Sequence, residues 1–196
     1  MFGLSFRKQS VSTYFDIPYL VKFILLFLTL YYFNLFYVAV VDGKGLLYSR
    51  FLDKYLNYIN WLRDSILYTS NMISHLLGLN SYVSLPYRIK VFHGPYVETV
   101  YACLGIGNTS FWVAFVMAHH DAWKRKILWV AIGMVSIWFI NCWRIALLLL
   151  ALQHGKAINK YLDHHTLFNI VAYLLIFFLV YLYTRNVRKS EEISPS

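Results

Sequence analysis

Charged residues are scarce in this sequence. Only 14% of the 196 residues are Asp, Glu, Lys or Arg, whereas an ordinary soluble domain has about 25%. Hydrophobic residues make up 59% of the chain, above the roughly 45 to 50% that is usual in soluble domains. This balance excludes an ordinary soluble protein and indicates an integral membrane protein.

Cysteine is also rare, and the two cysteines of the chain cannot form a disulfide framework. Cys142 lies inside a long apolar run, where a cysteine behaves as a small hydrophobic residue. Cys103 differs, because in "ETVYACLGIGNTSFW" it stands just before a Gly-x-Gly turn and at the start of an apolar run. This position makes the Cys103 thiol a candidate functional group.

Two further features are missing. The N-terminal residues contain no compact apolar stretch followed by a small-residue cleavage site, so we expect no removable signal peptide. The net charge of +9 is not gathered into one basic stripe, which argues against nucleic acid as a partner. The Lys and Arg clusters instead lie beside apolar runs and are interpreted as topology signals.

Long apolar runs dominate what is present. About 20 apolar residues cross a bilayer core, so we predict an all-α fold class, a polytopic membrane helix bundle with about four transmembrane spans. The predicted spans cover residues 20–41, 104–118, 127–152 and 166–183. They belong to a single membrane-embedded domain at 20–184, between a cytoplasmic N-terminal segment at 1–19 and a polar cytoplasmic tail at 185–196. The composition of the tail predicts disorder.

The segment at 42–103 has a different character. Residues 46–79 have helical periodicity and many aromatic side chains, but they also carry charges, which is typical of an interfacial helix. Short extended pieces between residues 80 and 99 flank a His-Gly-Pro turn and predict a small cap at the outer face. We expect this segment to lie at the outer face or interface without crossing the membrane.

The basic clusters predict an orientation. With four spans, Arg7 and Lys8, the cluster at 124–126 and the basic residues at 185–189 all fall on the same side of the membrane. The positive-inside rule makes that side cytoplasmic. We therefore predict a multi-pass protein of the cytoplasmic (inner) membrane, with Cys103 and the loop at 153–165 facing the periplasm or exterior.

Arg144 is the second candidate functional residue. At 1.5 Å per residue it lies about 26 Å from Ile127, near the outer edge of a hydrocarbon core about 30 Å thick. Apolar sequence flanks it on both sides, so its side chain either snorkels to the interface or faces the protein interior and finds a partner there. Asn141, one helical turn earlier on the same face, is a candidate neighbour.

Two histidines precede the last predicted span at the same depth. Alone, His164 and His165 are typical interfacial polar residues, with Asp163 as a helix cap. Together with the other candidates they suggest acyl-transfer chemistry. A thiolate at Cys103 would be the nucleophile, and Arg144 would stabilise the thiolate or an oxyanion. His165 would pass a proton to the leaving amine.

A metal site is an alternative for the histidines. The sequences HHD at 119–121 and DHH at 163–165 contain imidazoles and carboxylates that suit a metal ion. The predicted topology places the two clusters on opposite faces of the membrane. We therefore expect no metal ion and no cofactor.

The motifs "ACLGI", "NCWRI" and "HTLFN" occur in this order between about Thr99 and Tyr183. In this respect the chain resembles the exosortase/archaeosortase family, and its short length is similar to compact bacterial exosortases. The resemblance implies a cysteine transpeptidase with Cys103, Arg144 and His165 as a triad. Asn169 stands where many members have glycine, so His164 stays open as an alternative to His165.

The same resemblance implies the substrates. They would be exported proteins whose C-terminal sorting signal has a short motif, a hydrophobic span and a basic tail, cleaved at the outer face through a thioester intermediate. Membrane lipid is the other expected partner, and nucleic acid is not one. A non-enzymatic membrane scaffold or assembly factor is the alternative. A transporter is disfavoured because runs such as LLIFFLVYL offer no polar path.

Overall fold

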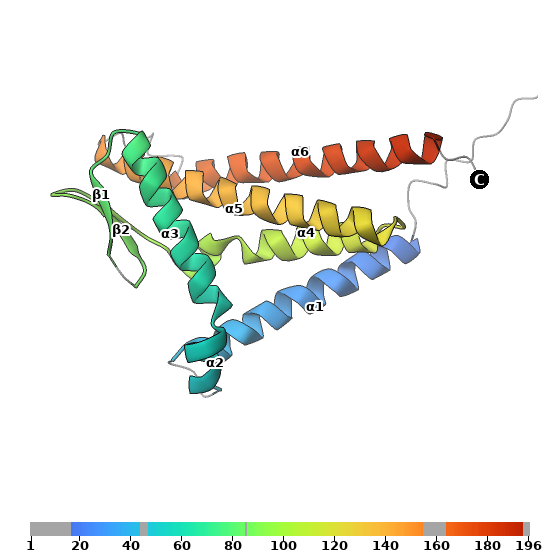
Figure 1. Cartoon of the computed structure of the whole chain (residues 1–196), viewed down its shortest axis with the longest axis horizontal. Helices are drawn as coiled ribbons and strands as arrows, with labels where there is room; N and C mark the ends of the chain where they lie inside the picture. The colour runs from blue at the N-terminus through green and yellow to red at the C-terminus, as the bar shows by residue number, and fades with distance from the viewer. Residues whose placement is uncertain (1–16, 44–46, 85, 155–163, 194–196) are drawn as a thin grey trace, which may run out of the picture.

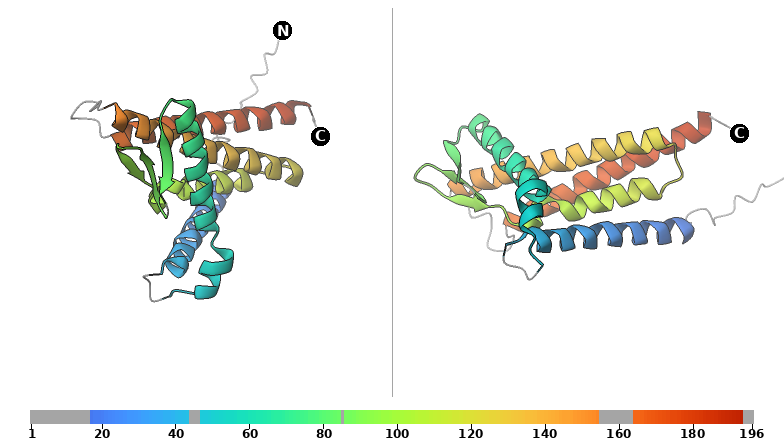
Figure 2. Two further views of the ribbon diagram at one scale, coloured as in Figure 1. Left: turned by 60° about the vertical axis from the view of Figure 1, so that its left-hand side comes forward. Right: turned by 60° about the horizontal axis from the view of Figure 1, so that its bottom comes forward.

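The computed structural model describes residues 17–43, 47–84, 86–154 and 164–193; at 102, 164–169, 171–172 and 188–193 only the backbone is described. Most of this part is helical. Neighbouring helices of the bundle pack in the order α1, α4, α5, α6 (Figures 1 and 2). The four helices are α1 (Ile17–Val41), α4 (Ile106–Ala118), α5 (Trp123–Gln153) and α6 (His164–Ile193).

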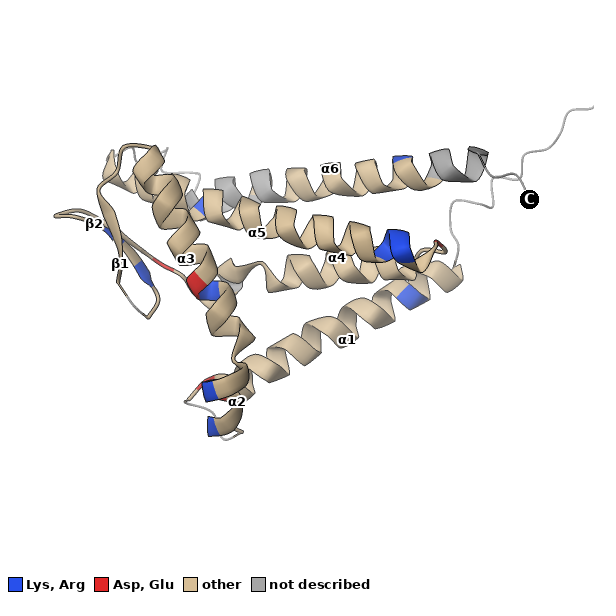
Figure 3. Cartoon of the chain, viewed as in Figure 1, with Lys and Arg blue, Asp and Glu red and all other residues tan. Residues whose placement is uncertain are grey.

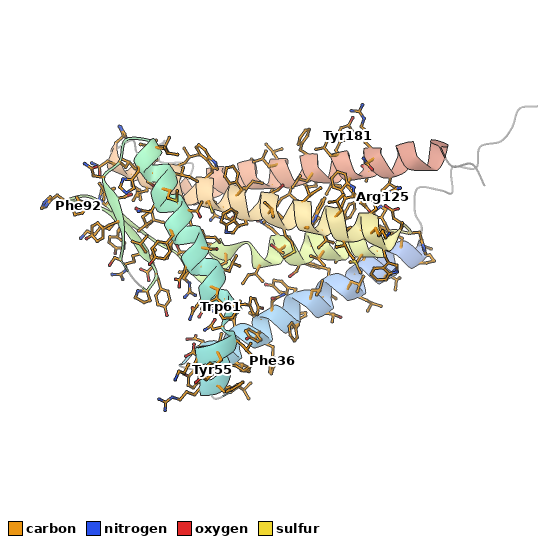
Figure 4. All side chains as sticks on the ribbon, in the orientation of Figure 1. Phe36, Tyr55, Trp61, Phe92, Arg125 and Tyr181 are labelled. Atoms are coloured by element: carbon orange, nitrogen blue, oxygen red, sulfur yellow. The ribbon has the colours of Figure 1, made fainter. Side chains whose placement is uncertain are left out.

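The bundle helices are apolar on their outer surfaces. Within the described residues, α1 and α5 are long and apolar enough to cross a membrane, and α4 and the stretch Tyr173–Val187 are shorter apolar helices. Large hydrophobic side chains stay exposed along them, and Figure 4 shows Tyr181 on the outer side of α6. Such extensive exposed apolar surface suits contact with lipid rather than water.

Helix α6 is longer than the sequence predicts. It continues to Ile193, through most of the tail for which we expect disorder. That expectation is wrong for residues 185–193, because this stretch contains no Gly or Pro and includes Arg, Lys and Glu, which favour helix. Helix α5 likewise begins at Trp123, four residues before the predicted start of its apolar run.

The segment after α1 forms two helices. Helix α2 (Arg50–Leu56) ends at Asn57, whose side-chain oxygen accepts a hydrogen bond from the Asn60 N–H at 3.0 Å and thereby caps α3 (Tyr58–Leu76). Helix α3 lies across one end of the bundle instead of running along it (Figure 1). Its buried face packs mainly on α5 and consists of Ile59, Arg63, Ile66, Leu67, Ser70, Ile73 and Ser74.

A three-stranded antiparallel sheet follows α3 at the same end of the bundle (Figures 1 and 2). Its order is β1 (Ser81–Ser84), β2 (Arg88–Val91) and β3 (Tyr96–Glu98). The predicted all-α class is therefore wrong for this segment, although extended pieces are expected there. Alternation explains the strands, because Ile89 and Val91 are buried while Arg88 is exposed.

Candidate functional site

Cys103 lies in a short 3₁₀ turn, η2 (Tyr101–Leu104), between the sheet and α4. Gly105 follows with a φ of 72° and caps the N-terminus of α4. A Cβ atom at Gly105 would lie 2.2 Å from Nδ2 of Asn141, so this position has no room for any other residue. The glycine thus lets the chain turn into α4 and leaves the thiol at the helix entrance.

The structure brings Cys103 and Arg144 together. Nη2 of Arg144, on α5, donates a hydrogen bond to Sγ of Cys103 at 3.8 Å. A guanidinium in this position can donate a charge-assisted hydrogen bond to an anion that forms at or beside the sulfur, and such bonds are stronger than neutral ones. Two of the three residues expected to carry chemistry therefore touch each other.

Asn141 contacts the same turn by another route. It is buried, and its Nδ2 donates to the backbone oxygen of Leu104 at 3.4 Å. Asn141 and Arg144 lie three residues apart on one face of α5, and each reaches η2. Through this contact, Asn141 holds the turn that carries Cys103.

The two candidate histidines begin α6. The backbone of His164 and His165 lies at the end of the bundle where α3 and the sheet also lie (Figure 1). Their side chains are outside the described residues, and so is Asp163. The distance from His165 to Cys103 stays a prediction. The HHD sequence at 119–121 connects α4 to α5 at the opposite end of the bundle.

A cavity of about 450 Å³ adjoins the Cys103–Arg144 pair. Arg144 forms part of its wall, and so does Tyr101 of η2. Other polar side chains of the wall come from α1, α4 and α6, and they are Tyr31, Asn34, Asn108 and Tyr173. A peptide substrate in this cavity would be next to the guanidinium that contacts the thiol.

Sequence reasoning misses Arg63, on α3. Its side chain is only 2% exposed, and its guanidinium carbon lies 4.3 Å from the ring centroid of Tyr87 and 4.7 Å from that of Tyr101. Nη1 donates to Asn60 at 2.9 Å, while Nε has no hydrogen-bond partner among the described residues. Arg63 thus stacks on the residue that begins the Cys103 turn. The sequence pattern that could have identified Arg63 is a charged residue on the apolar face of an amphipathic helix.

A second group that sequence reasoning misses is a polar cluster at the cavity wall. Nδ2 of Asn34 donates to the backbone oxygen of Leu30 at 2.7 Å and to Oγ of Ser110 at 3.3 Å. Its Oδ1 accepts a hydrogen bond from the hydroxyl of Tyr58. Burial raises the pKa of Tyr58 above its ordinary value, so this hydroxyl stays protonated and donates at neutral pH. The cluster joins α1, α3 and α4 beside the cavity.

The fold and the site together define a helical membrane protein with a thiol and a guanidinium in contact at one end of its bundle. The model of the family described as "Transmembrane exosortase (Exosortase_EpsH)" matches residues 17–182. Since this match covers most of the chain, the protein belongs to the transmembrane exosortase family, as the resemblance predicts. No curated protein and no solved structure matches the chain.

Proposed function

We propose that the protein is a cysteine transpeptidase or protease of the inner membrane that cleaves C-terminal sorting signals of exported proteins at the outer face. Membership of the exosortase family suggests a membrane transpeptidase. The observation that carries the proposal within this chain is the 3.8 Å contact between Arg144 and Cys103. A scaffold would not need a cation beside its thiol.

In the proposed reaction, His165 takes the proton of the Cys103 thiol, and the thiolate attacks the carbonyl carbon of the scissile peptide bond. The carbonyl oxygen gains the electron pair, and Arg144 stabilises the resulting oxyanion. When the C–N bond breaks, the imidazolium of His165 gives its proton to the leaving amine. The thioester left on Cys103 is then attacked by water or by an acceptor amine or hydroxyl, which restores the thiol.

The orientation we propose has four spans, both termini in the cytoplasm and the segment at 42–103 outside. The Lys and Arg beside the spans support it, because they occur near the starts of α1 and α5 and on the later part of α6, at the end of the bundle away from the sheet (Figure 3). Figure 3 also shows Lys and Arg on α2, α3 and the sheet, but these belong to the long segment between the first two spans, and the positive-inside rule applies to short loops. Exposed aromatic residues on α2, on α3 and in the turn between β2 and β3 support an interfacial position for this segment. They include Tyr55, Trp61 and Phe92 (Figure 4).

The test is processing of a tagged exported protein that carries a C-terminal hydrophobic span and a basic tail. The protein is co-expressed with wild-type enzyme or with the Cys103→Ala, Arg144→Ala or His165→Ala variant, and its size is followed on a gel. We expect cleavage with the wild type and none with these three variants. Cys142→Ala is the matched control, because it removes the other, buried thiol, and it should retain cleavage.

Two results would change the proposal. Normal cleavage by Cys103→Ala would exclude the nucleophile and favour a scaffold. His164→Ala distinguishes the two histidines: if it abolishes cleavage while His165→Ala does not, the proton-transfer role belongs to His164.

A further inference from the structure

The cavity beside Arg144 lies between two helices that are not packed on each other. Within the described residues, α1 packs mainly on α4, and α6 packs on α5. Tyr31 and Asn34 of α1 and Tyr173 of α6 nevertheless line the same cavity. In the part of the chain that the structure describes, α1 and α6 thus both contribute to the cavity wall without being main packing partners of each other.

The lining of this cavity combines apolar side chains, Leu35, Val38 and Ile106, with the polar ones named above. Asn108, in the first turn of α4, is half-buried in the cavity wall. Its side-chain amide makes no hydrogen bond to any described residue, whereas both polar atoms of the Asn34 amide are bonded. An amide that faces acyl chains without a partner is costly. The cavity therefore fits an occupant with its own hydrogen-bonding groups.

A peptide bond under attack has unpaired backbone groups. In a membrane-spanning helix the backbone N–H and C=O groups are satisfied within the helix. When the chain unwinds so that a thiolate can reach one carbonyl, the neighbouring groups lose these partners in a region with little water. A side-chain amide can donate and accept hydrogen bonds at once. Asn108 can therefore bond to the backbone N–H and C=O groups that lose their partners when the segment unwinds.

We propose that this cavity binds the unwound backbone of the substrate polypeptide at the scissile bond, with Asn108 hydrogen-bonding to it. The substrate arrives sideways between α1 and α6, and Arg144 contacts the carbonyl that Cys103 attacks. The inference rests on the proposed function and adds the binding site to it. Asn108 recognises backbone groups, so it contributes to affinity for any sorting signal that reaches the cavity.

The first experiment measures substrate affinity. Purified enzyme and the tagged exported protein are reconstituted in vesicles, and the cleavage rate is followed against substrate concentration. We expect Asn108→Leu to raise KM at least tenfold, and Asn108→Gln, which keeps the amide, to recover part of the loss. Thr109→Val, at the next position of α4 but outside this cavity wall, is the matched control and should resemble the wild type.

The rate at which iodoacetamide alkylates Cys103 separates binding from folding. It should be the same in Asn108→Leu as in the wild type, because the substitution leaves η2 and Arg144 in place. A KM within twofold of wild type would overturn the proposal. So would a fall in alkylation that parallels the fall in cleavage, because Asn108 would then be structural.

The second experiment locates the substrate directly. A photo-reactive benzoylphenylalanine replaces Tyr31 or Tyr173 in the Cys103→Ala variant, which keeps the cavity and leaves the substrate uncut. We expect cross-links to the substrate from both positions but not from Tyr181, which lies on α6 outside the cavity. Cross-links to lipid alone, or equal substrate cross-links from Tyr181, would overturn the binding site.

The two proposals can fail separately. If the wild-type enzyme leaves the exported protein uncut, the proposed function is wrong for that protein, while the cross-links still decide whether the cavity binds it. If the wild type cleaves and the cross-links are absent from α1 and α6, the function stands and the binding site is wrong.

Discussion

The guanidinium of Arg144 lies 3.8 Å from the sulfur of Cys103, although the two residues are 41 positions apart and belong to α5 and η2. The contact depends on the turn at Gly105, which is held by Asn141 one helical turn before Arg144. One face of α5 therefore both positions the thiol and supplies its cation. The consequences of this arrangement can be measured on the thiol itself.

Removal of the Arg144 charge should make Cys103 less reactive. We expect Arg144→Gln to lower the rate of Cys103 alkylation by iodoacetamide at pH 7 about tenfold, which corresponds to about 1.4 kcal/mol. Arg144→Lys should keep part of the rate, because Lys retains the charge without the planar fork of donors. The measurement is made in a Cys142→Ala background, so that only one thiol remains. Equal rates in all forms would show that Arg144 does not activate the thiol.

The turn at Gly105 allows a second prediction with a matched control. Gly105 and Gly78 both have positive φ, 72° and 83°, but a Cβ at Gly78 would have nothing within 4 Å. Gly78→Ala should therefore cost only the backbone strain, about 1 to 2 kcal/mol. Gly105→Ala should cost about 1 to 3 kcal/mol more, because its Cβ would overlap Asn141.

Thermal unfolding in detergent measures the loss of stability in Gly105→Ala and in Gly78→Ala. Gly105→Ala should also slow cleavage, since Asn141 must move away from the turn that carries Cys103, whereas Gly78→Ala should leave cleavage near wild type. Equal loss of stability in the two variants would contradict the close approach of Asn141.

Bilayer depth explains how much of the site the sequence could predict. Cys103 lies at the edge of an apolar run and Arg144 lies inside one, and helix rise together with membrane thickness places both near the outer edge of the hydrocarbon core. Asn108 begins a short polar run, Asn108 to Ser110, that has no periodic pattern, and the cavity that it lines depends on how far apart α1 and α6 stand. The stacking of Arg63 on Tyr101 depends on α3 crossing the bundle end, which no local pattern specifies.

The fold likewise has features that the sequence predicts and features that depend on contacts between distant residues. Hydropathy locates the long helices because lipid contact demands apolar residues over a known length. The sheet at Ser81–Glu98 is foreseen only as extended pieces, since strand pairing joins residues that are distant in the sequence. The end of α6 differs because helix propensity carries the helix beyond its apolar run.

Arg63 should influence Cys103 through Tyr101. Arg63→Lys keeps the charge but removes the planar surface that stacks on the two tyrosine rings, so we expect η2 to loosen and cleavage to slow about tenfold. Arg88→Lys is the control, because Arg88 also lies over a tyrosine ring and pairs with Glu98, but is exposed. Exposed pairs of this kind contribute about 0 to 1 kcal/mol.

Alkylation of Cys103 shows whether the effect of Arg63→Lys reaches the thiol. We expect the rate to change in Arg63→Lys and to stay at the wild-type value in Arg88→Lys. If Arg63→Lys lowers the melting temperature but leaves both alkylation and cleavage unchanged, Arg63 stabilises the fold without positioning the Cys103 turn.

The packing of α4 on α5 should tolerate no added methyl group at Gly133. A Cβ there would lie 1.8 Å from Nε1 of Trp112, which donates to the backbone oxygen of Trp129 at 3.0 Å. Gly133→Ala must therefore displace the indole or separate the helices, and overpacking of this kind costs about 1 to 3 kcal/mol. Because α4 follows the Cys103 turn and α5 carries Arg144, separation of these helices should also slow cleavage.

A double-mutant cycle tests whether the indole is the cause. Trp112→Phe removes the atoms nearest to the added methyl group, so the combination with Gly133→Ala should lose less stability than the sum of the single variants. Gly107→Ala is the control on α4, because its Cβ would meet Tyr31 at an ordinary 3.6 Å. It should be neutral or slightly stabilising, since alanine favours helix over glycine. Strict additivity in the cycle would show that Gly133 is required for a reason other than the approach of Trp112.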